Sequence, residues 1–338
     1  FTHAHVWFPW NTNEFVSAAA SNLQQTLILW TALVLTGLAV AFAFRCGLFN
    51  IGGQGQYWVG FFAALYIGTN LEGAPRPLHI LIAIVASIVA GAIWGGIAGF
   101  LKATVGAHEV ITTIMLNWIA FWVGSYLFSI GGPLQSDTEA SVPISNDVKE
   151  SAKLPVLWGD VQGLHTGVFI AIVALIAFWL IIDRTTLGYR IRAVGFNPEA
   201  ARYGGIDVAR SYFLAMAIAG AFAGLAGAID ILGWEYRYGQ VDIQASEIGF
   251  AGIAVALLGR NRAVGILFSS LLFGALLTGT STRNLNPEVF DPALAGNLTL
   301  IIQGLVVLFV GADLLVLWLW QARRKLPLPG RRAKAVGE

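Results

Sequence analysis

The sequence predicts an all-α, polytopic membrane helix bundle, built as a single domain from residues 1–338. Composition is the first reason: 57% of the residues are hydrophobic and only 12% are charged, about half the charged fraction of a soluble domain. The second reason is that apolar residues form runs close to the ~20 residues that a membrane crossing needs. The third is glycine, with 39 residues, many of them inside these runs, as expected where membrane helices pack closely.

Nine apolar segments are candidate membrane spans. Two of them are unusual, because 55–71 follows a glycine-rich break and 247–259 is short for a complete crossing. The nine segments are 26–44, 55–71, 79–101, 110–130, 164–182, 211–232, 247–259, 264–281 and 298–320.

The distribution of Lys and Arg predicts the orientation, because short cytoplasmic loops are enriched in both. Residues 183–210 contain five arginines and the tail 321–338 contains six basic residues, so we expect both to be cytoplasmic. The stretch 131–163 has two lysines against five acidic residues, so we expect it outside, where it either receives a substrate-binding protein or covers the bundle. Because each span changes the side of the membrane, counting spans back from these segments places residues 1–22 outside. Alternatively, 247–259 is a re-entrant hairpin that does not cross the membrane. The chain would then make one crossing fewer, and the basic tail would lie outside, against the distribution of Lys and Arg.

Residues 1–22 lack the basic and then apolar pattern of a signal peptide. A chain that begins outside without such a signal is expected to have an additional helix before its first residue. We therefore expect ten spans in the native protein.

A compact polar unit, "GFNPEAARYGGI" (195–206), interrupts the apolar sequence. Asn197 is a helix-capping residue, Pro198 suits a first turn, and Gly204 with Gly205 ends a helix. The predicted helix, 198–203, is too short to be stable alone in water, so it needs a surface to bind. Either the unit is an ordinary cytoplasmic loop whose arginines fix the topology, or it is a docking helix for a soluble partner.

The segment "TTLGYRIRAVGFNPEAARYGGIDV" (185–208) resembles the coupling loop of ABC-importer permeases, in the branch of branched-chain amino acid, simple-sugar and nucleoside systems. Four further segments resemble successive landmarks of the nucleoside and simple-sugar permeases, in the same order, and the resemblance covers about 210 residues in all. They are "GLFNIGGQGQYWVG" (47–60), "HEVITTIMLNWIA" (108–120), "AGAFAGLAGA" (219–228) and "GFAGIAVALLGR" (249–260).

The resemblance implies a type II-like ABC importer permease in a bacterial plasma membrane, working by alternating access. It implies a cytoplasmic ABC ATPase as partner, which would bind ATP and Mg, an extracytoplasmic substrate-binding protein, and a second permease, expected to be a paralogue in a heterodimer. Nucleosides are the first expectation for the substrate, simple sugars such as ribose the second, and branched-chain amino acids the third. The docking segment would be Asn197, Pro198, Glu199, Ala200, Ala201 and Arg202.

Polar residues within the apolar sequence are candidates for the substrate pathway. Asn50, Gln54 and Gln56 lie in "FNIGGQGQ" (49–56), which is either a cytoplasmic turn with its amides facing water or a broken helix deep in the core. A second glycine-rich segment, 246–259, occupies a comparable place in the other half of the chain. It contributes two more candidates, Glu247, which is either functional or at the water interface, and Phe250.

Asn117 and Trp118 complete the candidates for the pathway. Asn117 either bonds a neighbouring helix or faces the substrate. Trp118 is one of four tryptophans suited to stacking on a ring, the others being Trp94, Trp122 and Trp179.

Other classes of function find little support. No G-x-x-x-x-G-K-[ST] motif occurs, so ATP hydrolysis is expected in a partner rather than in this chain. The five histidines are scattered, so we expect no metal site and no catalytic residue, and no nucleic-acid partner is expected. The main alternative is a secondary transporter or channel for a small polar solute, which would need charged residues at mid-span.

Overall fold

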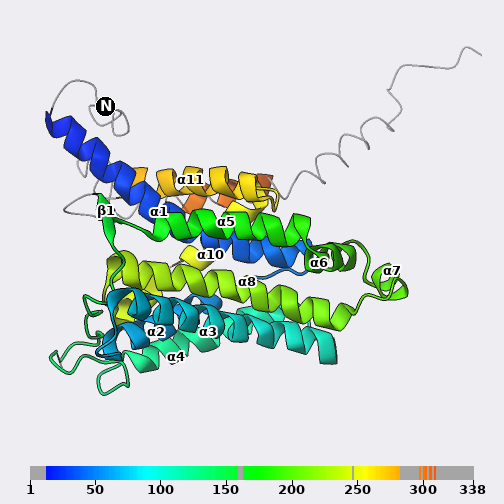
Figure 1. Ribbon diagram of the computed structural model, residues 1–338, viewed down its shortest axis with the longest axis horizontal. Coiled ribbons are helices and arrows are strands. Elements are labelled where there is room, and N and C mark those ends of the chain that lie inside the picture. The colour runs from blue at the N-terminus through cyan, green and yellow to red at the C-terminus, as the bar shows by residue number, and fades with distance from the viewer. Residues whose placement is uncertain are drawn as a thin grey trace, which may run out of the picture.

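The computed structural model describes residues 13–139, 141–158, 163–245 and 247–281, with residues 297, 300–302, 304–306 and 308–309. Helices dominate this part of the chain (Figure 1), beside one short antiparallel pair of strands, β1 (Val156–Trp158) and β2 (Leu164–His165). The basic tail, much of the expected span 298–320 and the first twelve residues lie outside the described residues.

The long helices coincide with expected spans. In the described residues, six helices are long and apolar enough to cross a membrane, the sixth being a joint segment of α9 (Gln240–Ala245) and α10 (Ile248–Leu258). The full number of crossings stays a prediction. The five long helices are α1 (Asn13–Arg45), α3 (Arg76–Val105), α4 (Glu109–Leu127), α5 (Gly167–Arg184) and α8 (Val208–Asp230), which a π-helical turn, η1 (Ile231–Glu235), extends.

Three apolar helices are shorter. α2 (Gly53–Asn70) has 18 residues, α11 (Ala263–Gly279) has 17, and α10 has 11. At 1.5 Å per residue, α10 is about 16 Å long, roughly half of the ~30 Å hydrocarbon core of a bilayer. The short segment that the sequence shows at 247–259 is therefore a half-length helix.

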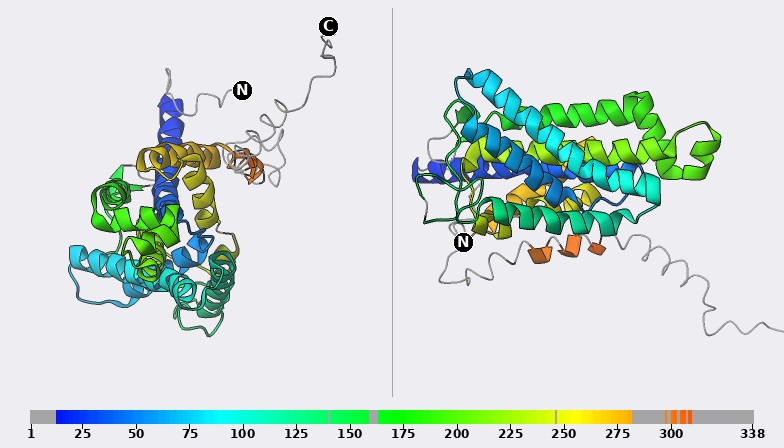
Figure 2. Two further views of the ribbon diagram at one scale, coloured as in Figure 1. Left: turned by 90° about the vertical axis from the view of Figure 1, so that its right-hand side faces the viewer. Right: turned by 90° about the horizontal axis from the view of Figure 1, so that it is seen from below.

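Helix α1 lies at the centre of the bundle. All residues from 30 to 43 are buried, so the helix has no polar face and is enclosed on every side. The view along the bundle shows α1 between the green helices and the yellow ones, with its N-terminal end projecting beyond them (Figure 2, left).

Helices α3 and α8 approach each other through small residues spaced by four. A Cβ added at Gly220 would lie 2.1 Å from the carbonyl oxygen of Gly91, and one added at Gly95 would lie 2.4 Å from that of Met216. Only glycine permits this separation, which is how membrane helices gain contact area without a hydrophobic driving force.

Segments expected on opposite sides of the membrane lie at opposite ends of the bundle. Helices α6 (Thr186–Phe196) and α7 (Pro198–Tyr203) are at one end, and β1 with the segment after α4 is at the other (Figure 1). That segment covers the bundle: the backbone N–H groups of Lys149 and Leu154 donate to the carbonyls of Gly68 and Leu232. Whether it also receives a binding protein stays a prediction.

Candidate functional site

Two helices begin at the same point in the protein core, one from each half of the chain. α2 starts at Gly53 and α10 at Ile248, and the Gln54 side chain accepts a hydrogen bond of 2.7 Å from the backbone N–H of Gly249. A Cβ added at Gly249 would lie 2.3 Å from the Cα of Gln54, so the contact requires glycine. Broken helices of this kind form sites in transporters.

The amides before α2 are buried and bonded to one another. Asn50 Nδ2 donates to Gln56 Oε1 at 3.0 Å, and Gln56 Nε2 donates to Asn50 Oδ1 at 3.2 Å. Asn50 Oδ1 also accepts from the backbone N–H of Gly52 at 2.9 Å. Asn50, Gln54 and Gln56 are all fully buried. The alternative in which these amides face water is therefore wrong, because tertiary contacts fold the glycine-rich segment inward.

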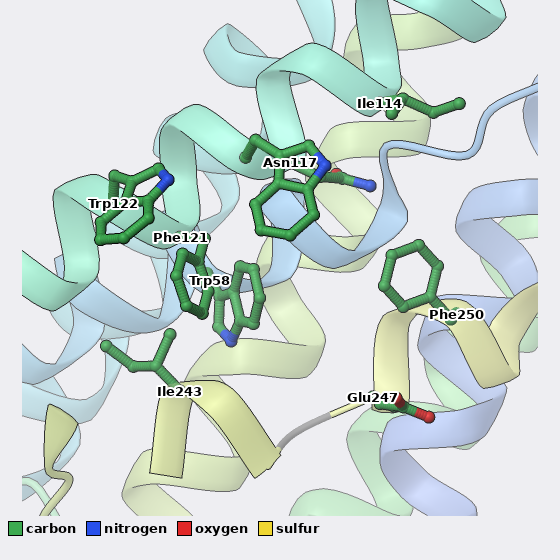
Figure 3. A pocket seen from close by; sticks show the side chains of 9 residues that line it. Trp58, Ile114, Asn117, Phe121, Trp122, Ile243, Glu247 and Phe250 are labelled. Atoms are coloured by element: carbon green, nitrogen blue, oxygen red, sulfur yellow. The ribbon is translucent and has the colours of Figure 1, made fainter. Parts of the chain in front are cut away.

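A cavity of about 560 Å³ lies beside this point, between α2, α4, α9 and the start of α10. Four candidates for the pathway line it together, although they come from segments about 130 residues apart: Asn117, Trp118, Glu247 and Phe250. Figure 3 shows Asn117, Glu247 and Phe250 around the space, with Trp122 and Phe121 on the α4 side. Asn50, Gln54 and Gln56 are not among its lining residues.

The walls of the cavity are aromatic. Phe121 contacts Trp118, Trp122 and Trp58 with ring centroids 5.7, 5.2 and 5.9 Å apart, and the first two contacts are edge-to-face, a favoured geometry. Trp118 and Trp122 are 57% and 65% exposed, so the cavity opens along the outer face of α4.

Of the other tryptophans predicted to stack on a ring, Trp94 and Trp179 do not line the cavity. The sequence interpretation missed Trp58, whose role depends on which side of α2 is turned toward α4.

The polar side chains of the cavity differ in whether they already make hydrogen bonds within the protein. Asn117 Oδ1 accepts from the backbone N–H of Gly55 at 2.8 Å, and its Nδ2 donates to the carbonyl of Ile51 at 2.9 Å. Asn117 thus bonds the start of the neighbouring helix, as one of its two interpretations predicts. Glu247 caps α10, because its carbonyl accepts from Phe250 and Ala251, while its side chain is exposed.

The cytoplasmic unit folds as its local signals predict. α7 spans Pro198–Tyr203, and Asn197 caps it by accepting from the backbone N–H groups of Glu199 at 2.9 Å and Ala200 at 3.0 Å. Gly205 then takes a positive φ of 77° and ends the helix. Arg192 holds the preceding helix α6 to the end of α5, through an ion pair of 2.9 Å with Asp183.

Helix α7 presents most of its side chains to solvent. Glu199, Ala200 and Arg202 are exposed and Ala201 is buried, and within this described segment no ion pair joins Glu199 to Arg202. Two aromatic residues flank the unit, Phe196 and Tyr203, with 90% and 94% of their surfaces exposed. The sequence interpretation missed both, although large aromatic residues beside a polar docking segment are a usable signal for binding hot spots.

Apolar helices that cross a membrane, two helix starts meeting in the core, a lateral cavity and an exposed docking helix define the membrane subunit of a transporter. The chain belongs to the family described as branched-chain amino acid transport system / permease component, whose model matches residues 22–311. It is therefore a multi-pass permease.

Several characterised permeases are similar to it over most of their length. It is 39% identical to the guanosine ABC transporter permease protein NupP of Bacillus subtilis over 289 residues, which cover 86% of this chain and 80% of the relative. It is 35% identical to the nucleoside ABC transporter permease protein NupB of Lactococcus lactis over 309 residues (89% and 83%). It is also 35% identical to the glucose ABC transporter permease protein TsgB13 of Haloferax volcanii over 297 residues (85% and 75%).

Proposed function

We propose that this chain is the membrane-spanning, non-catalytic subunit of an ATP-driven importer that moves nucleosides into the cell. The observation that carries this proposal is α7, a capped helix of six residues that is held at the end of the bundle with its side chains in solvent. Of its six residues only Ala201 is buried, and the exposed remainder suits a groove on a soluble partner. The named solutes of NupP and NupB support nucleosides as the cargo.

The partner at α7 is a cytoplasmic ABC ATPase, which supplies the ATP and Mg. Phe196 and Tyr203 would anchor the contact, and Glu199 and Arg202 would set its orientation through charge, since aromatic anchors dominate binding energy and charges dominate specificity. Because a cytoplasmic partner places α7 on the cytoplasmic side of the membrane, the tail 321–338 is cytoplasmic and residues 1–22 are extracytoplasmic. The membrane is a bacterial plasma membrane, crossed nine times by this chain, with α9 and α10 together forming the seventh crossing.

A continuous chain of contacts joins the docking helix to the cavity. Gly195, at the end of α6, touches the end of α1, because a Cβ there would lie 2.4 Å from the Arg45 carbonyl oxygen. The segment after Arg45 leads to the paired amides of Asn50 and Gln56 and then to the start of α2, where Gln54 holds α10. Movement of α7 would reach the cavity by this route, as coupling through packed elements requires.

The importer needs two permeases. Bacillus subtilis has two guanosine permeases similar to this chain, NupP and NupQ, and Lactococcus lactis has two nucleoside permeases, NupB and NupC. This supports a heterodimer with a paralogue, and the open side of the cavity along α4 is a surface that a second subunit would close. The extracytoplasmic partner is a substrate-binding protein, received at the end of the bundle covered by residues 131–158.

Co-purification tests the proposal. The tagged chain is expressed with its neighbouring genes, and the eluate is assayed for bound proteins and for ATP hydrolysis. We expect an ATPase to elute with the wild type and to be lost in a Glu199→Ala/Arg202→Ala variant, with the bundle intact. A Phe196→Ala/Tyr203→Ala variant should lose it equally.

The matched control is Glu150→Ala/Lys153→Ala, which removes a charge pair of the same spacing at the opposite end of the bundle. It should retain the ATPase. Elution of the wild-type chain without any ATPase in several detergents would refute the proposal and favour a secondary transporter or channel.

A further inference from the structure

A buried hydrogen-bond donor in the cavity has no partner. Trp58 is only 6% exposed, it lines the cavity, and its indole Nε1–H has no hydrogen-bond partner in the described part of the chain. An unpaired N–H in a buried position costs free energy. In Figure 3 the nitrogen lies on the ring edge that faces the side of the cavity where Ile243 and Glu247 stand. The N–H is thus an unpaired donor buried in the wall of the cavity.

A matching acceptor lines the same cavity. The Glu247 carboxylate belongs to the lining, its side chain is exposed, and no ion pair of the described residues includes it. A carboxylate only accepts hydrogen bonds, and an indole N–H only donates them. The third polar residue, Asn117, already uses its amide on the backbone around α2. Among the described lining residues, Glu247 is thus the free acceptor and Trp58 the buried unpaired donor. The indole N–H groups of Trp118 and Trp122 belong to side chains on the exposed face of α4.

The rest of the lining restricts the ligand further. Among the described residues, the lining contains no Lys or Arg to pair with a phosphate or a carboxylate, and Glu247 would repel both. The aromatic rings around Phe121 offer faces and edges to a flat ring. A volume of about 560 Å³ is within the usual range for small-molecule sites.

We propose that Trp58 and Glu247 bind the sugar hydroxyls of a neutral nucleoside whose base lies among the aromatic rings of α4. A sugar hydroxyl can both accept and donate, so one hydroxyl accepts from Trp58 Nε1–H and another on the same ring donates to the Glu247 carboxylate. This inference rests on the proposed function, since it specifies how an imported nucleoside is held in the membrane.

Uptake by cells that express the complete transporter tests this site. The rates for radiolabelled guanosine and 2′-deoxyguanosine are compared at concentrations that saturate the binding protein, which is the same in every strain. Trp58→Phe removes the N–H and keeps an aromatic ring, and Glu247→Gln removes the charge. Trp94→Phe is the matched control, because the Trp94 Nε1–H is also buried without a partner in the described residues but lies outside the cavity lining.

We expect Trp58→Phe to lower the ratio of the guanosine rate to the deoxyguanosine rate by roughly three- to tenfold, and Glu247→Gln by about tenfold or more, as for neutral and charged hydrogen bonds. Trp94→Phe should leave the ratio unchanged.

Two results overturn the assignment while leaving nucleoside import intact. One is an equal change, or no change, in both rates. The other is a changed preference between guanosine and inosine with an unchanged deoxyguanosine ratio, which would place the base edge on these groups. If the wild-type complex takes up no nucleoside, the proposed function itself fails, and this inference fails with it.

Discussion

The contact between the starts of α2 and α10 is open to a sharp test, Gly249→Ala. A Cβ at this position would lie 2.3 Å from the Cα and 2.5 Å from the N of Gln54, whereas carbon atoms in contact stay about 3.5–4.0 Å apart. Both atoms belong to backbone, so they cannot move aside as a side-chain tip would. The two helix starts must therefore separate by about 1 Å or more.

The expected loss of stability in the Gly249→Ala variant is the sum of two costs. Overpacking of a filled core costs about 1–3 kcal/mol, and loss of the 2.7 Å bond from Gly249 N–H to Gln54 leaves buried polar groups at about 1–3 kcal/mol. Together they amount to roughly 2–6 kcal/mol. With an unfolding entropy of about 2.1 cal/mol/K per residue for 338 residues, the melting temperature should fall by roughly 3–8 °C.

The assay is thermal loss of the monodisperse peak in detergent, followed by nucleoside uptake for the variant that still folds. Gly279→Ala is the control, because a Cβ there meets no atom of the described residues within 4 Å, and it should melt with the wild type. A Gly249→Ala protein with unchanged melting temperature and uptake would show that the two helix starts do not touch.

Two further predictions concern the route from the docking helix. Gly195→Ala places a Cβ 2.4 Å from the Arg45 carbonyl oxygen, at an overpacking cost of about 1–3 kcal/mol. We expect the ATPase to co-purify normally while uptake falls by roughly tenfold, and equal losses of binding and uptake would contradict the proposed route. Asn197→Ala removes both capping bonds of α7, worth about 1 kcal/mol, so affinity for the ATPase in nanodiscs should fall roughly fivefold at an unchanged melting temperature. Unchanged affinity would show that α7 needs no preformed helix to bind.

The parts of the structure that depend on neighbouring residues in sequence were predictable. The bounds of α7 follow from Asn197, Pro198 and Gly204, because a cap, a first-turn proline and a terminating glycine act within one or two turns of helix. The half-length α10 follows similarly from a short apolar run. Their polar character within apolar segments made Asn117 and Glu247 candidates for the pathway, and both line one cavity.

The parts that depend on tertiary contacts were not predictable. The amides of Asn50 and Gln56 read equally well as a water-facing turn, because their burial is decided by helices distant in sequence. Trp58 follows a glycine-rich segment in which nothing indicates which face of α2 meets α4. The aromatic character of Phe196 and Tyr203 beside the docking segment is a signal in the sequence, but their exposure depends on how α6 and α7 project from the bundle.

The meeting of two helix starts also sets the electrical balance of the cavity. The N-terminus of each helix carries a partial positive charge of about half an elementary charge, so α2 and α10 together contribute close to one positive charge beside the cavity. Glu247 is the N-cap residue of α10 and makes no side-chain capping bond, but its negative charge stands at the start of this helix and offsets the partial positive charge there. Charge at the site is thus balanced, within the described residues, by helix ends and one carboxylate rather than by basic side chains, which leaves hydrogen bonding and ring contacts to decide which solutes cross.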